Sequence, residues 1–185
     1  SLVVADENGP RSSWDQPTGW RAGSVVQGTP GQPEPAAPLI PPILITEALT
    51  HTDLPEVDSI ELYNPNPTNV NIGGWLLSDD FRTPKYQLPA GTIIPANSYR
   101  VFDETDFNPT PGTNNSFNLR SSGDDVYLFS ADAGGNLTGF VHGFDFGAAL
   151  NGVSFGRYIT SIGAEHFVAQ TATTWSNANA GPRVG

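Results

Sequence analysis

The feature that most constrains the fold is a series of short apolar segments that follow one another from residue 43 to residue 159. They are rich in β-branched and aromatic residues and are bounded by Gly, Pro, Asn or Asp, which is the pattern of strands separated by turns. No window repeats apolar residues at the i, i+3, i+4 spacing of an amphipathic helix. The predicted strands are ILITEALT (43–50), SIELYN (59–64), GWLLSD (74–79), TIIP (92–95), YRVFD (99–103), DVYLFS (125–130), TGFVHGFDF (138–146) and VSFGRYI (153–159). Short strands at this spacing predict an all-β fold, an antiparallel β-sandwich of immunoglobulin size, with a small barrel as the alternative.

The second segment shows the period-two alternation of a strand with one buried face. Ile60 and Leu62 fall on one side, where we expect the core, and Glu61 falls on the opposite face. The stretch that follows, NPNPTN, predicts a rigid polar connection. Next comes the pair Gly73-Gly74, which we expect to let the chain turn so that Trp75 packs in the core.

Composition changes along the chain predict four parts. Residues 1–31 resemble the end of a preceding module, and residues 32–42, with five Pro in eleven residues, read as a semi-extended linker. Residues 43–160 hold the predicted sandwich, and residues 161–185 form a polar closing segment. The ending TTWSNANAGPRVG loosely echoes GWRAGSVVQGTPG near the start, which is consistent with tandem modules. The chain therefore reads as a fragment of a longer polypeptide.

The charge balance excludes two classes of partner. The chain carries 8 Lys and Arg against 19 Asp and Glu, for a net charge of −11. Nucleic-acid binding needs clustered basic residues that displace counterions from phosphates, so neither a nucleic acid nor an anionic membrane surface is expected as a partner. No apolar run approaches the roughly 20 residues that cross a bilayer. Cysteine is absent, so thiolate metal sites are excluded, and the low charge density favours an extracellular protein.

The middle of the chain resembles the lamin-tail domain, an immunoglobulin-like β-sandwich of nuclear lamins and of many bacterial exported proteins. Four pieces in the expected order carry the resemblance: I-x-E-A-L-x-H (45–51), IELYNPNPTNVNIGGWLLSDD (60–80), YQLPAGTIIPANSYRVF (86–102) and FNLRSSGDDVYLF (117–129). The resemblance implies a non-catalytic module for protein interaction, attachment or spacing within a larger exported bacterial protein. Its expected partner is a protein or cell-surface component. Bacterial members are often joined to hydrolase domains, so the alternative is a calcium- or carbohydrate-binding accessory domain of a secreted hydrolase.

One short motif suggests an enzyme. The stretch GVSFG around Ser154 has the G-x-S-x-G pattern of serine hydrolases, and Glu165 and His166 follow in the required chain order. That mechanism needs the serine on a turn between a strand and a helix, whereas this stretch reads as a strand with no helix after it. We therefore expect no catalytic residue. The remaining imidazoles, His51 and His142, show no zinc-ligand spacing with His166.

The acidic residues offer one candidate metal site. Calcium is bound by six to eight oxygen ligands, several of them carboxylates. Asp103, Glu104 and Asp106 lie close together in sequence and could bind calcium with a neighbouring loop, although the stretch fails the EF-hand pattern. Solvated acids on a turn are the competing interpretation. No cofactor other than this calcium ion is expected.

The four tryptophans could form a platform for sugar rings. Trp75 follows Gly-Gly and precedes Leu-Leu, which favours the sandwich core. Trp14, Trp20 and Trp175 lie in the terminal segments, where an indole ring can pin a tail to the sandwich.

Overall fold

The computed structural model describes residues 2–23, 29–33, 35 and 39–184, which fall into two compact units, Ser1–Ile40 and Pro41–Gly185. In the first unit, β1 (Leu2–Val4) pairs antiparallel with β2 (Trp20–Ala22), and two short 3₁₀ turns, η1 (Arg11–Asp15) and η2 (Pro17–Gly19), join them. Trp20 Nε1 donates a hydrogen bond of 2.6 Å to the backbone carbonyl of Trp14, so the Trp20 indole ties β2 to η1. Its origin as the remnant of a preceding module stays a prediction. Residues 34 and 36–38 of the predicted linker lie outside the described residues.

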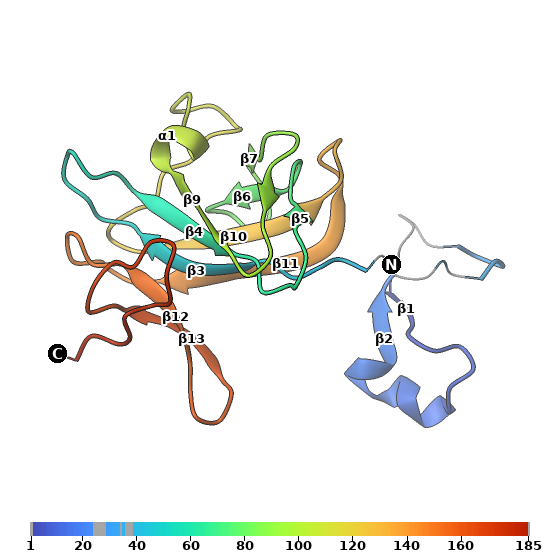
Figure 1. The fold of residues 1–185 in the computed structure, drawn as a ribbon. Coiled ribbons are helices and arrows are strands. Elements are labelled where there is room, and N and C mark those ends of the chain that lie inside the picture. The colour runs from blue at the N-terminus through green and yellow to red at the C-terminus, as the bar shows by residue number, and fades with distance from the viewer. Residues whose placement is uncertain (1, 24–28, 34, 36–38, 185) are drawn as a thin grey trace. The chain divides into compact units, whose positions relative to one another are not determined.

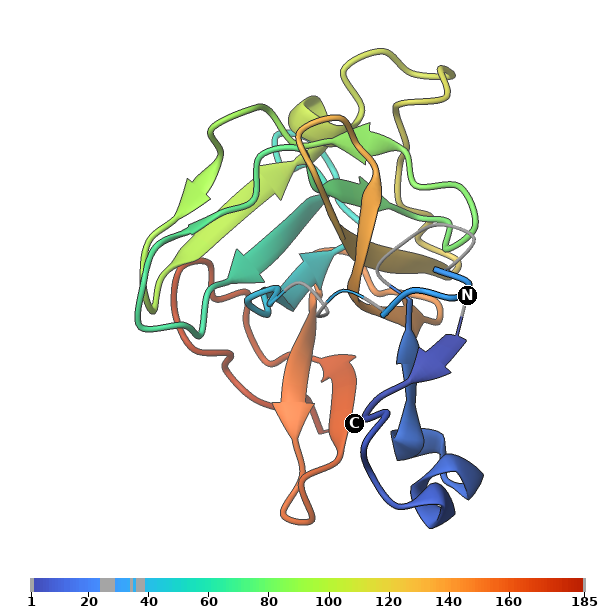
Figure 2. The same cartoon turned by 90° about the vertical axis from the view of Figure 1, so that its right-hand side faces the viewer.

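The second unit is a sandwich of two antiparallel sheets (Figure 1, Figure 2). The five-stranded sheet has the order β13 (Glu165–Ala169), β12 (Phe155–Ile159), β3 (Leu44–Leu49), β4 (Ser59–Tyr63), β9 (Tyr99–Asp103). The four-stranded sheet has the order β11 (Leu137–Phe146), β10 (Asp124–Ala131), β6 (Leu76–Ser78), β7 (Tyr86–Gln87). A small ladder of β5 (Val70–Asn71) and β8 (Ile93–Ile94) lies beside them. The prediction of an immunoglobulin-like antiparallel β-sandwich is confirmed.

Every segment predicted as a strand contains one, and among the described residues of the second unit the structure adds three strands and a helix. The added elements are β5, β7, β13 and the one-turn helix α1 (Glu104–Phe107). Strands of two residues are too short to show alternation, which explains why β5 and β7 leave no periodic pattern in the sequence. Among the described residues, no helix has the length or the apolar character needed to cross a bilayer.

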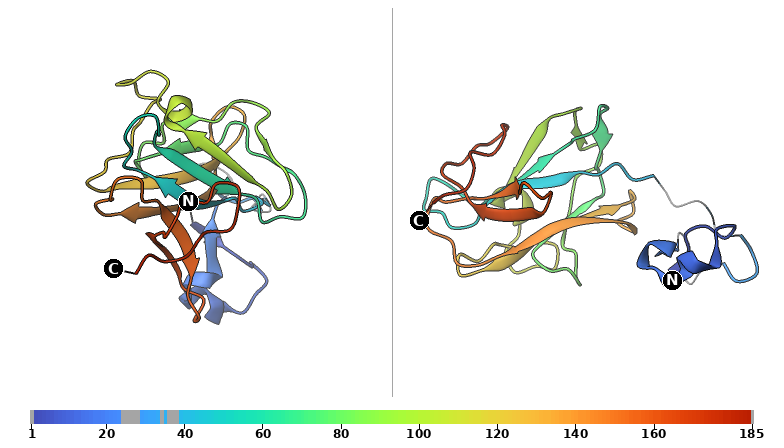
Figure 3. Two further views of the ribbon diagram at one scale, coloured as in Figure 1. Left: turned by 60° about the vertical axis from the view of Figure 1, so that its left-hand side comes forward. Right: turned by 90° about the horizontal axis from the view of Figure 1, so that it is seen from below.

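The core lies between the two sheets and contains the residues that alternation assigned to it. Ile60 and Leu62 are fully buried, and Trp75 is 5% exposed. Gly74 has a φ of +91°, a conformation that side-chain-bearing residues rarely adopt, so the predicted turn before Trp75 is confirmed. Glu61 does lie on the opposite face, but it is also fully buried. The chain after β13 covers this outer face of the five-stranded sheet (Figure 3).

Candidate functional site

Two buried carboxylates stand side by side on the outer face of the five-stranded sheet. Glu47 on β3 is the direct cross-strand partner of Glu61 on β4, so the two side chains share a face, and both residues are fully buried. Like charges directly opposite each other destabilise a sheet, and a buried charge needs hydrogen bonds or a counter-ion. The pair therefore requires donors from another part of the chain.

The C-terminal segment supplies most of those donors. Glu47 accepts hydrogen bonds from the Ser154 hydroxyl, from the Thr174 backbone N–H at 3.0 Å and from the Thr174 hydroxyl at 2.8 Å. Glu61 accepts bonds from the Thr46 hydroxyl at 2.7 Å and from the Ser176 backbone N–H. Burial raises the pKa of Glu61, the bonds from Ser176 and Thr46 lower it, and the negative charge of Glu47 raises it.

We call residues 173–179 the C-terminal latch, because both carboxylates and one amide bind it to the sheet. Asn179 Nδ2 donates to the carbonyls of Thr46 and Arg157, at 2.8 and 2.9 Å. Trp175 lines a hollow of 450 Å³ together with Leu49 and Val101, and the expectation that this indole holds the tail on the sandwich stays a prediction. The latch is therefore fastened at several points along the face.

The hydrolase motif is part of this structural network. Ser154 is 1% exposed, and its hydroxyl donates to Glu47. Glu165 and His166 pair with Ile159 and Tyr158, at the other end of β12. No imidazole contacts the Ser154 hydroxyl among the described contacts, so the motif does not form a serine–histidine pair.

The structure assigns the predicted calcium ligands to two different places. Asp103 caps helix α1 by accepting bonds from the Thr105 backbone N–H at 2.8 Å and its hydroxyl at 2.6 Å. Asp106 completes the capping box by accepting from the Asp103 backbone N–H at 3.2 Å. Within the part of the chain that the structure describes, no group of three or more His, Asp or Glu residues is arranged to hold a metal ion. Calcium binding by all three residues stays a prediction.

Glu104 instead faces a polar hollow together with Asp58, which we call the Asp58 pocket. The pocket has a volume of 230 Å³, and its lining residues are Thr50, His51, Thr52, Asp58, Glu104, Asn118, Leu119 and Ser121. Burial raises the pKa of Asp58 to about 6, while a 3.0 Å hydrogen bond from the Thr52 hydroxyl opposes the shift and the charge of Glu104 adds to it. The sequence places Asp58 and Glu104 far apart, so only the pairing of β4 with β9 could reveal this pocket.

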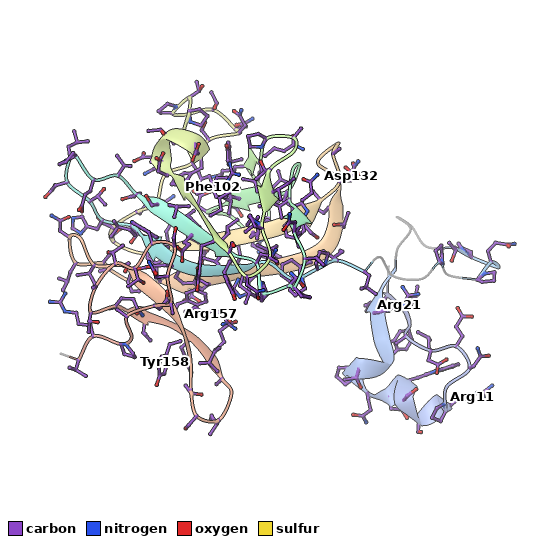
Figure 4. The ribbon with its side chains drawn as sticks, in the orientation of Figure 1. Arg11, Arg21, Phe102, Asp132, Arg157 and Tyr158 are labelled. Carbon is purple, nitrogen blue, oxygen red and sulfur yellow. The ribbon has the colours of Figure 1, made fainter. Side chains whose placement is uncertain are left out.

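A second hollow, of 320 Å³, is lined by aromatic residues at the other end of the latch. Tyr63 and Tyr99 are cross-strand partners whose ring centroids lie 4.5 Å apart, and Tyr158 on β12 is 41% exposed. Arg157 and Asn179 line the same hollow, and the buried amide oxygen of Asn179 has no hydrogen-bond partner among the described residues. Figure 4 shows the Arg157 and Tyr158 side chains at β12.

Comparison with protein-family models gives one match. The model of the Lamin Tail Domain matches residues 37–143. Comparisons with curated proteins and with solved structures give no match. The matched range includes Glu47 and Glu61 but ends inside β11, so the latch that binds these carboxylates lies beyond it.

Proposed function

This chain belongs to the lamin tail domain family, and from that premise we propose that it is a non-catalytic module that spaces or attaches neighbouring parts of a larger, exported bacterial protein. In this role it presents a rigid immunoglobulin-like sandwich to protein or cell-surface partners. Of spacing, attachment and interaction with partners, we favour spacing.

The observation that carries this proposal is the path of the chain through the second unit. The chain enters the sandwich at one end, ahead of β3, and the terminal segment lies at the other end (Figure 1, Figure 3). The latch holds that terminal segment on the sheet through Glu47 and Glu61. A module whose two ends are held apart by a packed core keeps its neighbours at a set separation.

Two further observations support a non-catalytic, exported module. The only residue with a hydrolase-like motif, Ser154, is buried and bonded to Glu47, so its hydroxyl is not available to a substrate. The net charge of −11 and the absence of cysteine are compatible with an exported bacterial protein.

A distance measurement tests the spacer role. The chain has no native cysteine, so Pro42→Cys and Val184→Cys, both at exposed positions, can carry one pair of spin labels. We expect pulsed electron paramagnetic resonance to give a single narrow distance distribution in the full chain. A control pair of spin labels at Pro42→Cys and Asp145→Cys spans only the sandwich. The width of its distance distribution is the width expected for a rigid body. A Val184 distribution much broader than this control would mean that the tail is not fastened, and the spacer proposal would fail.

The tyrosine-lined hollow favours glycan binding as a second candidate function. Sites for small ligands combine aromatic walls with a few polar groups, and here Tyr63, Tyr99 and Tyr158 line the hollow together with Arg157 and Asn179. These groups could stack on a sugar ring and bond to its hydroxyls. The tryptophans considered from the sequence do not line this hollow.

We expect a soluble glycan from a panel of bacterial and plant polysaccharide fragments to shift the NMR signals of residues around Tyr158. Tyr158→Ala should abolish the shifts, because it removes the most exposed ring of the hollow. Tyr86→Ala, on β7 of the other sheet, is the matched control and should leave binding unchanged. Shifts that survive in Tyr158→Ala, or a panel without any effect, would count against a glycan site here.

A further inference from the structure

His142 connects the two sheets of the sandwich through one hydrogen bond. It lies on β11, at the edge of the four-stranded sheet, and its cross-strand partner on β10 is Leu128, which is fully buried. The His142 side chain shares this inward face and is 11% exposed. Its Nδ1 accepts a 3.0 Å hydrogen bond from the backbone N–H of Ile45 on β3. The imidazole therefore joins an edge strand of one sheet to the central strand of the other.

The backbone N–H of Ile45 depends on this imidazole. Within the described strands, β12 pairs with β3 at Glu47 and Ala48, and this ladder ends before Ile45. Ile45 is fully buried, so water does not offer its N–H a replacement partner. Almost all buried backbone N–H groups in proteins are paired, because an unpaired one costs free energy. The His142 nitrogen is thus the acceptor that this part of β3 requires.

The same bond fixes the protonation state of the ring. A neutral imidazole has one nitrogen that accepts and one that donates, whereas both nitrogens of the charged ring carry a proton. Because Nδ1 accepts from Ile45, the proton of neutral His142 lies on Nε2, which is 3.4 Å from Glu165 Oε1 on β13. A second proton, at Nδ1, would place a donor against the N–H of Ile45. The charged ring and the bond between the sheets therefore exclude each other.

The charges around the ring also favour its neutral form. Burial lowers the pKa of His142, the charge and hydrogen bond of Glu165 raise it, and the charge of Arg157 on β12 lowers it, with a net downward shift. Arg157 Nε also pairs with the same oxygen of Glu165, so a neighbouring cation already balances this carboxylate. β3 and β10 present Ile45 and Leu128 to the ring, and neither carries a charge.

We propose that His142 is a pH-sensitive connection between the two sheets, in which the neutral imidazole joins β11 to β3 and proton uptake in mildly acidic surroundings releases this edge of the sandwich. The edge also involves β13. Phe167 on β13 lies against the imidazole at a ring-centroid distance of 6.1 Å, and it stacks on Phe144 of β11 at 3.7 Å. A change at the ring therefore acts on the contacts of three strands.

The sign of the pH dependence follows from the direction of the shift. A histidine whose pKa is lowered by folding binds a proton more readily in the unfolded chain, so stability rises with pH between the two pKa values. The contribution of His142 is complete above the ordinary imidazole pKa of about 6.5 and is lost as the pH falls below it. Burial raises the pKa of Asp58 and of Glu61, which gives these acids the opposite sign. A local measurement is therefore needed.

NMR of the full native chain between about pH 8 and about pH 5 tests the connection. We expect the ring nitrogens of His142 to show the neutral form protonated at Nε2 at the upper end, and to titrate below about pH 6.5. Over the same interval, the protection of the Ile45 amide from hydrogen exchange, relative to its intrinsic rate at each pH, should fall at least about tenfold. The amides of β4, which pair within the five-stranded sheet, should keep their protection.

His142→Asn is the matched variant, because its amide oxygen stands in place of Nδ1, can accept from Ile45 and does not titrate. Its Ile45 amide should keep the same protection throughout the pH interval. His166→Asn, at an exposed position of β13, is the control and should lose protection in acid as the native chain does.

Three results would overturn the proposal. They are a native His142 that titrates at or above about pH 6.5, a native Ile45 amide whose protection is unchanged at about pH 5, and an equal loss of protection in His142→Asn. The first two are measured on the native chain, so they stand even where a variant does not fold.

Discussion

Replacing Glu47 by alanine is expected to lower the melting temperature of the sandwich by about 10 °C. The substitution removes the acceptor of the Ser154 hydroxyl and of both the backbone N–H and the hydroxyl of Thr174. Each buried donor left unpaired costs about 1–3 kcal/mol, and the latch can undock to return two of them to water, so the expected net loss is about 3–4 kcal/mol. For a domain of this size, 1 kcal/mol corresponds to roughly 3 °C.

The mechanism of this loss can be separated from a general loss of packing. In Glu47→Ala, we expect the backbone amide protons of Thr174 and Ser176 to lose protection from hydrogen exchange, while those of β10 in the other sheet keep theirs. Glu47→Gln is the matched control. Its amide oxygen can still accept from Thr174, its NH₂ group can donate to Ser154, and the repulsion with Glu61 disappears. A glutamine variant as unstable as the alanine variant would contradict the role assigned to these hydrogen bonds.

Replacing Gly74 by alanine is expected to cost at least about 3 kcal/mol of unfolding free energy. The backbone at Gly74 has a φ of +91°, which costs a side-chain-bearing residue roughly 1–2 kcal/mol. A Cβ atom there would also lie 2.4 Å from the carbonyl oxygen of Asp132, which is backbone and cannot rotate away. Asp132 lies in the turn between β10 and β11 (Figure 4), so the clash would separate this turn from the chain that leads into Trp75.

A second glycine offers a matched control for backbone strain alone. Gly91 has a φ of +78°, and a Cβ atom there would meet nothing within 4 Å. Gly91→Ala should therefore lose only about 1–2 kcal/mol. Urea denaturation of both variants measures the difference. If the two substitutions cost the same, the close approach of Asp132 to Gly74 does not contribute to stability.

Several parts of this structure were predictable because their causes are local. Alternation at Ile60 and Leu62, together with the β-branched and aromatic content of the other segments, predicted the strands and the sandwich. The Gly-Gly pair predicted the turn that brings Trp75 into the core. The capping box of α1 also has a local signal, an acid at Asp103 and another three residues on, but the same spacing equally predicts a set of metal ligands.

The environment of Glu61 could not be predicted from its neighbours in sequence. Alternation assigns it to the outer face of a sheet, where a carboxylate is normally solvated. Its burial depends on Ser176, which lies 115 positions away and donates to it only after β13 has reversed the chain across the sheet. The same holds for the Asp58 pocket, where Thr50, Asp58 and Glu104 meet through strand register.

The sequence by itself determined most of the strands, which of their faces meets the core, and where the chain must turn before Trp75, because these properties depend on side-chain shape, hydrophobicity and backbone freedom within a few residues. Only the tertiary structure decided which polar groups are buried and what they bind. In sequence, Glu47, Glu61 and Ser154 resemble solvated residues. Their burial depends on long-range hydrogen bonds, because a buried charge without a partner costs free energy.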